Sequence, residues 1–361
     1  MADRPMTLLR VARTVPGKRS GTDHPATDLV VEALSGVPGP EWDARVAALG
    51  GYAFHSRAYA LASGDLGEEP MFLVLRRGER PAGFAVALRL RTRVRPLGWA
   101  RDVLRVPSPP VLEEDVSRTQ ALGALAAFAA RHRMAQLEVN AYGDSHPEHV
   151  ALVDVARVRW SPRLDYRVAL GADFESTVAR MGATHRRHIR RAMDIPFTFE
   201  ERSDCEGARL MHAVHLETFA RRRALGQSES RAWSAAEFHR RMDAYIERGV
   251  VRFHFTRLDG EIVSAIGTMS FGRTSYYLVG GTTRAGFERN AAYAMFAHTM
   301  RRLIAEGVTE FSLGGTGAGA ADDASPEHGL YRFKKGYGAR VCDCPHVRIR
   351  VTGWRWWPVA Q

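Results

Sequence analysis

Aromatic, glycine and cationic residues alternate in the segment GLYRFKKGYGARV, residues 329–341. Its three glycines allow the backbone to approach a ligand closely. Lys334 offers a compact cation, and Tyr331, Phe333 and Tyr337 offer flat surfaces for stacking. We therefore expect a strand-loop that contacts phosphate, or the terminal ribose and base of an RNA. The alternative is a buried aromatic strand whose lysines extend to solvent.

A second cationic segment, TVARMGATHRRHIRRAMD, occupies residues 177–194. Arg186 lies four positions before Arg190, and Arg187 four before Arg191, so like charges repel along a helix. A bound phosphate-rich partner would relieve this repulsion, because the planar guanidinium suits phosphate. The alternative is a solvated basic face. The helix itself is predicted by an apolar stripe of Val178, Met181, Ile189 and Ala192.

The whole chain is basic. Its 361 residues include 51 Lys+Arg against 40 Asp+Glu, a formal net charge of +11. This excess favours a polyanionic partner such as nucleic acid, a phosphate-rich substrate or an anionic membrane. A solvated basic surface without a specific partner is the alternative.

Three cysteines are too few for a disulfide framework and fit a reducing compartment. We expect no metal site, because Cys342 and Cys344 lack further ligands at zinc spacing and arginines surround His185 and His188. The longest apolar run, at 121–130, is too short to span a membrane, and the N-terminus lacks the apolar region of a secretory signal. A soluble cytoplasmic protein is expected.

The order of elements is the same in the two halves of the chain. Residues 71–88 and 252–271 each read as a hairpin, the second with Asp259-Gly260 at its turn. In each half a further strand, a long helix and a last strand follow, the helices at 119–134 and 290–307. We predict duplication rather than coincidence. The expected units are a flexible basic tail at 1–25 and two α/β (α+β) domains at 26–165 and 166–361.

Antiparallel hairpins followed by a helix that enters a parallel strand pair are the layout of the GCN5-related N-acetyltransferase (GNAT) fold. A doubly wound nucleotide-binding fold is disfavoured, because the glycine-rich turn that it needs after the first strand is missing.

Five segments, in order, resemble the Fem-type aminoacyltransferases, which are duplicated-GNAT proteins related to the enzymes that add amino acids to peptidoglycan precursors. They are RRHIRRA (186–192), HLETFARRRALG (215–226), DGEIVSAIGTMSF continuing to YYLVGG (259–281), EGVTEFSLGG (306–315) and GLYRFKKGYGA (329–339). The resemblance implies two tandem GNAT-like domains and transfer of an aminoacyl group from aminoacyl-tRNA to an amine. No heptad-patterned stretch indicates the helical arm of many cell-wall members, so the acceptor stays open.

The resemblance also assigns residues to the site. It places Phe333 and Lys334 at the reaction centre, Arg221 at the acceptor, and Tyr276 or Tyr277 beside the substrate. The chemistry of the residues adds Tyr331 to the substrate-binding set, and it assigns to tRNA the cations Arg186, Arg187, Arg190, Arg191 and Lys335.

The acyl donor separates two hypotheses, since a GNAT fold normally implies acetyl-CoA. Coenzyme A needs an R/Q-x-x-G-x-G/A turn whose backbone amides hold its pyrophosphate. Residues 283–292 have one glycine in place of the spaced pair, and residues 106–119 carry prolines and acidic residues. The coenzyme cradle is therefore missing from both halves, and we expect no cofactor, with aminoacyl-tRNA as co-substrate.

An aminoacyl ester is already activated, so the enzyme must mainly position an amine against its carbonyl. Glu113, Glu114 or Asp115 is the expected general base, and Lys334 is expected to stabilise the developing oxyanion or the leaving ribose oxygen. Two alternatives remain open: an N-acyltransferase that uses acyl-CoA or a carrier-bound acyl group, and a catalytically silent RNA-binding protein.

Overall fold

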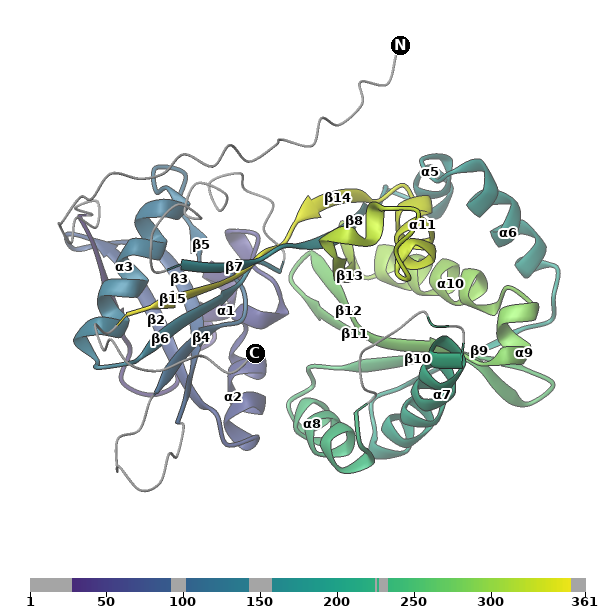
Figure 1. The fold of residues 1–361 in the computed structure, drawn as a ribbon, viewed down its shortest axis with the longest axis horizontal. Coiled ribbons are helices and arrows are strands. Elements are labelled where there is room, and N and C mark those ends of the chain that lie inside the picture. Colours follow the sequence, from purple (N-terminus) through teal and green to yellow (C-terminus); the bar gives the residue numbers. More distant parts are fainter. Residues whose placement is uncertain (1–27, 92–101, 143–157, 225, 227–232, 352–361) are drawn as a thin grey trace, which may run out of the picture.

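The computed structural model describes residues 28–91, 102–142, 158–224, 226 and 233–351. They form two lobes, each built on one sheet that carries helices (Figure 1). The basic tail predicted at 1–25 lies outside the described residues. In the part of the chain that is described, no helix combines the length and the apolar character needed to cross a bilayer.

The first lobe contains an eight-stranded sheet. Its strands run in the order β1 (Leu29–Ala33), β2 (Glu69–Arg77), β3 (Arg80–Leu90), β4 (Val103–Val106), β6 (Gln136–Asn140), β15 (His346–Arg350) and β7 (Val158–Ser161), and β5 (Val111–Leu112) pairs with β3. Its helices are α1 (Glu41–Ala48), the short 3-10 helix η1 (Ala53–His55), α2 (Arg57–Asp65) and α3 (Arg118–Arg131).

The second lobe contains a seven-stranded sheet. The order is β14 (Arg340–Asp343), β8 (Arg163–Ala169), β13 (Glu310–Gly317), β12 (Thr274–Thr282), β11 (Glu261–Phe271), β10 (Arg252–Leu258) and β9 (Thr198–Arg202). Its helices are α5 (Phe174–Ala179), α6 (Ala183–Met193), α7 (Cys205–Ala224), α8 (Ala235–Glu247), α9 (Arg284–Glu288), α10 (Ala291–Ala305), η3 (Ala318–Ala321) and α11 (His328–Gly336).

The repeated order of elements is confirmed. Each half has an antiparallel hairpin, β2–β3 or β10–β11, and later one parallel pair, β4–β6 or β12–β13, joined across a helix. Asp259 and Gly260 form the two-residue turn of the second hairpin, with φ of 51° and 85°. Positive φ at both positions is what a type I′ turn requires, which is why Asp-Gly predicted this hairpin correctly.

The boundary predicted between residues 165 and 166 needs correction, because the sheets exchange strands. That boundary falls inside β8, which belongs to the second sheet from residue 163. The strand β15, near the end of the chain, pairs with β6 and β7 in the first sheet. In Figure 1 this yellow strand lies among the blue strands of the first lobe.

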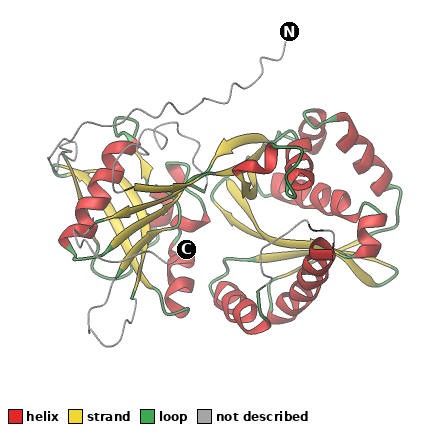
Figure 2. Ribbon diagram, in the orientation of Figure 1, coloured by secondary structure: helices red, strands yellow, loops and turns green. Residues whose placement is uncertain are grey.

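The lobes also share a hydrophobic core. Trp42 of α1 and Phe72 of β2 belong to the same buried cluster as Met211 of α7, Phe238 of α8 and Phe253 of β10. A second cluster lies between α3 and the other face of the first sheet, and a third joins α10 to the second sheet. Figure 2 shows α7 and α8 on one side of the second sheet and α10 on the other. The junction between the lobes is therefore a packed interior.

Two sequence predictions about local structure were wrong. Residues 177–194 are not one helix, because α5 ends at Ala179 and α6 starts only after Gly182, which has extended dihedral angles. The strand-loop expected at 329–341 is the helix α11 followed by β14. The helical form is favoured because Phe333 and Tyr337, four residues apart, enter one aromatic cluster.

Candidate active site

Lys334 is buried at the centre of the second lobe. Its side chain is 6% exposed, and its Nζ donates a hydrogen bond to the backbone oxygen of Gly315 at 3.0 Å. The rings of Tyr166 and Tyr277 lie 5.4 and 5.9 Å from Nζ. Burial lowers the pKa of Lys334 to about 8, although the nearby Asp165 carboxylate opposes this by favouring the charged form. Lys334 is thus a desolvated amine that titrates near neutral pH.

The carboxylate with the largest influence on the pKa of this lysine comes from β8. Asp165 is fully buried and pairs with Gly315 across β8 and β13. Its Oδ1 accepts a hydrogen bond from Ser312 at 2.8 Å, and its Oδ2 accepts one from Arg167 Nε at 3.2 Å. The aspartate in the middle of the strand RLDYRVA was the signal that sequence reasoning missed, since a buried charge needs partners.

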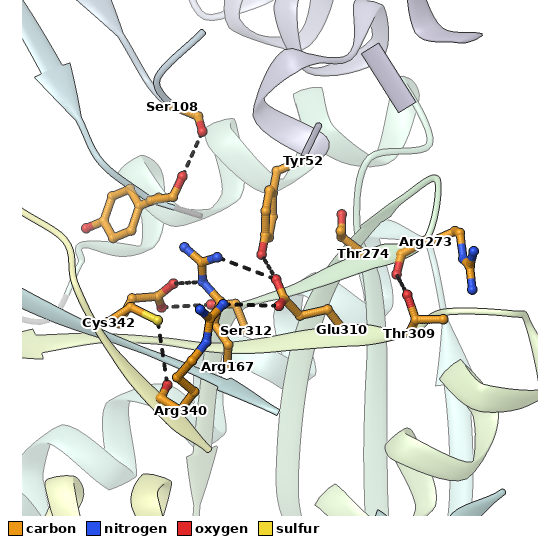
Figure 3. Close-up of polar contacts among 12 residues, drawn as sticks. Tyr52, Ser108, Arg167, Arg273, Thr274, Thr309, Glu310, Ser312, Arg340 and Cys342 are labelled. Atoms are coloured by element: carbon orange, nitrogen blue, oxygen red, sulfur yellow. Dashed lines mark hydrogen bonds and ion pairs between the residues drawn. The ribbon is translucent and has the colours of Figure 1, made fainter. Parts of the chain in front are cut away.

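A polar network around Arg167 and Glu310 reaches Tyr52 of the first lobe (Figure 3). Arg167, which bonds Asp165, also lies 3.6 Å from Glu310 Oε1 through its Nη1. The hydroxyl of Tyr52, which precedes η1, donates to the same Glu310 carboxylate. Burial raises the pKa of Tyr52, so this hydroxyl stays protonated and continues to donate. The network therefore ties Asp165, which acts on the pKa of Lys334, to the other half of the protein.

The two candidate tyrosines of β12 point to opposite faces of the sheet, as the alternation of a strand requires. Tyr277 faces Lys334 and stacks on Phe296 at 5.8 Å between ring centroids. Tyr276 contacts Phe54 and Tyr142 of the first lobe at 5.0 and 5.7 Å. The structure therefore groups Tyr277, and not Tyr276, with Lys334.

Tyr331 lies beside the same lysine. Its ring centroid is 6.0 Å from that of Tyr166, which also faces Lys334. Its hydroxyl accepts a hydrogen bond from Lys335 at 3.3 Å. Helix α11 thus directs Lys334 inward while Lys335 and Tyr331 lie toward its outer side, with Lys335 exposed.

Phe333 is partly buried and packs against the core on another side of α11. Its ring packs at 5.4 Å from Tyr293, 5.7 Å from Phe296 and 5.2 Å from Tyr337. Its backbone oxygen is 2.8 Å from His185 Nε2 of α6. The ring of Phe333 holds α11 against its neighbours, while the lysine that follows it enters the site.

Of the three consecutive arginines in the last turn of α7, Arg221, Arg222 and Arg223, it is Arg222 whose charge acts on the lysine. Arg221 lies over the ring of Phe287 at 4.7 Å. The charge of Arg222 instead lowers the pKa of both Tyr277 and Lys334, although burial is the larger influence on each. Successive side chains of a helix point about 100° apart, so Arg221 and Arg222 lie on different faces of α7.

The expected general bases lie apart from this group. Asp115 forms exposed ion pairs with Arg77 and Arg80, at 2.9 and 2.8 Å. Glu113 follows β5, where its backbone N–H bonds to Ala82. Glu114 is exposed in the same loop. The carboxylates that act on the pKa of Lys334 are Asp165 and Glu327 instead.

Three of the four arginines of α6 form an exposed cationic face. Arg187, Arg190 and Arg191 are exposed, and none has a carboxylate within ion-pair distance among the described residues. Arg186 is partly buried and donates to the backbone oxygen of Met181 at the end of the α5 region. We call Arg187, Arg190, Arg191 and the exposed Lys335 of α11 the basic face.

The two helices that carry the basic face are joined closely. The N–H of Gly182, before α6, donates to the backbone oxygen of Gly336 at 2.9 Å. A Cβ at Gly336 would collide with the ring of His185. The glycine that suggested close approach to a ligand is therefore needed for contact between α6 and α11.

Comparison with known proteins now adds to this geometry. Residues 179–335 match the model of the acetyltransferase (GNAT) domain family. Among solved structures, the crystal structure of FemX superposes with a TM-score of 0.70 at 15% identity, over 88% of this chain and 96% of that one. This chain has a Fem-like tandem GNAT fold.

A second tandem GNAT protein, from the clavulanic acid biosynthesis pathway, gives a TM-score of 0.50 at 12% identity, over 90% of this chain and 99% of that one. No curated protein matches this chain by sequence. The acetyltransferase model and the tandem GNAT structures together support an acyltransferase of the GNAT type.

Two backbone amides are already bonded to side chains in the turn of the second GNAT unit where acyl-CoA would bind. Between β12 and α10, the N–H of Arg284 donates to the Glu217 carboxylate at 2.8 Å, and the N–H of Gly286 to the Thr283 hydroxyl at 3.1 Å. In the first unit, Ser117 and Gln120 cap α3 reciprocally. A pyrophosphate at the turn of the second unit would have to displace a carboxylate of like charge. In the described chain, no group of three His, Cys, Asp or Glu side chains could hold a metal ion.

Proposed function

We propose that this protein moves an amino acid from aminoacyl-tRNA to the amine of a small-molecule or peptidoglycan-precursor-like acceptor, and so forms an amide bond. The observation that carries the proposal is the Glu217 carboxylate on the Arg284 amide, where an acyl-CoA pyrophosphate would need a free donor. An acyl donor that is bound through a group other than the coenzyme A pyrophosphate is therefore favoured.

The basic face supports tRNA as the carrier of the acyl group. Three arginines without described carboxylate partners lie on α6, and Lys335 is exposed on α11, the helix that carries Lys334. Because α6 and α11 are in contact, a phosphate backbone on this face would bring the end of a bound tRNA toward Lys334. The net charge of +11 adds long-range attraction for a polyanion.

The chemistry assigned to Lys334 follows from its burial. The neutral acceptor amine attacks the ester carbonyl, the new C–N bond forms, the bond to the ribose oxygen breaks, and that oxygen receives the proton lost by the amine. A fixed ammonium in a water-poor site stabilises the oxygen that gains charge in this step. Asp165 keeps Lys334 more easily protonated than burial alone would allow.

The test is a transfer assay with purified full-length protein. Total tRNA charged with labelled amino acids is mixed with a panel of amines, and label is measured in amide products. One arm is treated with RNase first, and another replaces charged tRNA with labelled acetyl-CoA.

We expect RNase-sensitive transfer from tRNA and none from acetyl-CoA. RNase-insensitive transfer that requires acyl-CoA would overturn the proposal, and tRNA binding without transfer would indicate an RNA-binding protein. The proposed reaction belongs in the cytoplasm, where charged tRNA is found.

A further inference from the structure

A pocket of about 340 Å³ lies on the polar face of the first sheet. Along β4, β6 and β15, alternate residues such as Leu104, Leu137 and Val347 enter the core under α3, so their neighbours face the other way. The pocket is lined by Arg105, Glu138, Asn140, His346 and Arg348 from these strands, together with Phe54, Tyr59, Pro107, Tyr142 and Arg163. Polar groups on the strands and aromatic walls facing them are typical of a small-molecule site.

The charges in this pocket are unbalanced. Glu138 is shared between Arg105, at 3.3 Å, and Arg348, at 3.5 Å, and Glu68 approaches Arg105 at 3.7 Å. Arg163 has no carboxylate within ion-pair distance in the described chain, and its guanidinium lies over the ring of Tyr142 at 4.7 Å. Burial lowers the pKa of His346, so this ring is neutral near pH 7. Arg163 is therefore the cation in the pocket that is left to meet an anion.

The pocket adjoins the buried lysine. A Cβ at Gly315 would lie 3.8 Å from both Arg163 Nη2 and Tyr142 Cε1, while the backbone oxygen of Gly315 accepts the hydrogen bond from Lys334. One residue of β13 thus separates the wall of the pocket from the reacting centre. Gly315 therefore borders both the pocket and Lys334.

We propose that this pocket binds the acceptor of the transfer reaction, and that the acceptor is a compact amine with a carboxylate or phosphate bound by Arg163. The inference rests on the proposed function for its reaction, and it narrows the acceptor to one class. A volume of about 340 Å³ is at the lower end for ligand pockets, which favours a small acidic amine over a peptidoglycan precursor. The planar guanidinium binds either anion through two hydrogen bonds.

The first experiment measures binding without tRNA, using the full chain. Matched probes differ only in the acidic group: glycine and glycinamide, β-alanine and β-alaninamide, phosphoethanolamine and ethanolamine. Isothermal titration, at a pH below the pKa of every amine in the set, gives the ratio of affinities within each pair. We expect the acids to bind about tenfold or more tightly than their neutral partners. The carboxylate and phosphate pairs show which anion is preferred.

Arg163→Ala should remove this preference for acids, and Arg163→Lys should keep part of it. Arg91→Ala is the matched control, because Arg91 is an exposed arginine of the same lobe that pairs with Glu69 outside the pocket. Melting temperatures of all variants check that they fold. The proposal is wrong if the acids bind no more tightly than the neutral partners, if none of the acids binds, or if Arg163→Ala retains the preference.

A second measurement separates this inference from the proposed function. The same pairs are offered as acceptors with charged tRNA. If acids bind preferentially but receive no amino acid, the tRNA-dependent reaction fails while the site for acidic ligands stands. If amino acids are transferred to large neutral amines with no preference for acids, the acceptor class proposed here fails while the reaction stands.

Discussion

Lys334 is one of three lysines in the chain, with Lys18 and Lys335, whereas the other basic side chains counted are arginines. Arginine stays charged in proteins, whereas the pKa of a lysine shifts readily on burial. A lysine at position 334 can therefore change its protonation state where an arginine could not. The pKa of Lys334 near 8 places both protonation states within reach at physiological pH.

We predict that Lys334→Met lowers turnover by about 10²–10³-fold, because a fixed cation at the developing oxyanion is lost. The unbranched methionine keeps much of the packing and removes a desolvated charge, so the free energy of unfolding should not fall. Rates of amide formation and urea unfolding measure the two effects. Arg332→Met, at an exposed position of the same helix, is the control that should keep its turnover. Full activity in Lys334→Met would remove Lys334 from the mechanism.

The rate should also depend on pH. Because the acceptor amine must be neutral, its own ionisation raises the rate with pH in every variant, so the native rate is divided by that of Lys334→Met at each pH. If protonated Lys334 is the active form, this ratio of kcat/KM values falls as pH rises through about 8, where burial has set the pKa of Lys334. Asp165→Asn removes the carboxylate that raises this pKa, so the fall should move to lower pH. A ratio that instead rises through pH 8 would show that neutral Lys334 acts, as a base.

The burial of Lys334 also makes the free energy of unfolding depend on pH, in a direction that can be stated. The folded pKa of about 8 lies below the usual 10.5, so the unfolded chain binds more protons between these values. The contribution of Lys334 to stability therefore rises with pH from about 8 to 10.5. Comparing urea unfolding of the native chain and Lys334→Met across this range measures it, and parallel curves would contradict a depressed pKa.

At the scale of elements, α6 and α11 carry both the basic face and the buried lysine. Gly182 and Gly336 join them at the point where a larger residue at 336 would meet His185. The sequence showed the arginine spacing of α6, which is local. It did not show that α5 and α6 are separate, because the apolar stripe continues across the break at Met181.

We predict that replacing Arg187, Arg190 and Arg191 together by alanine weakens tRNA binding at low salt. The slope of log affinity against log salt should fall by about 1 for each arginine that contacts a phosphate. Filter binding at several salt concentrations measures it. The control replaces three exposed arginines that each contact at least one carboxylate, Arg80, Arg91 and Arg209, and removes the same charge. Equal losses in both triple variants would show that only net charge matters.

At the scale of the whole molecule, the two halves form one folding unit. The strand β15 completes the first sheet from the far end of the chain, and aromatic side chains of both halves share a core. Arg248 at the end of α8 also pairs with Asp65 of α2 at 2.8 Å. These connections hold the Arg163 pocket and Lys334 in a fixed relation.

Val347→Ala should therefore destabilise the first lobe although it lies in the last strand of the chain. Val347 is 2% exposed in the core under α3, and its truncation should cost about 1–3 kcal/mol of unfolding free energy. Hydrogen exchange should show lost protection in β6 and β7, the partners of β15. Arg350→Ala, exposed on the same strand, is the control. Loss of protection limited to the second lobe would contradict strand exchange.

The sequence by itself determined what depends on neighbours along the chain. Asp259-Gly260 specified a hairpin turn, and the repeated hairpin, strand, helix and strand specified two GNAT units. Short-range sterics and periodicity fix such features, so spacing is enough to find them.

Only the tertiary structure decided which distant residues meet. Asp165, Gly315 and Lys334 come together from β8, β13 and α11, and β15 crosses into the first lobe to form the Arg163 pocket. Side-chain burial and strand pairing between remote segments decide these contacts, so they cannot be predicted from the spacing of neighbouring residues. For this reason the acidic loop at 113–115 was expected to supply the base, whereas the carboxylate with the largest influence on the pKa of Lys334 is Asp165.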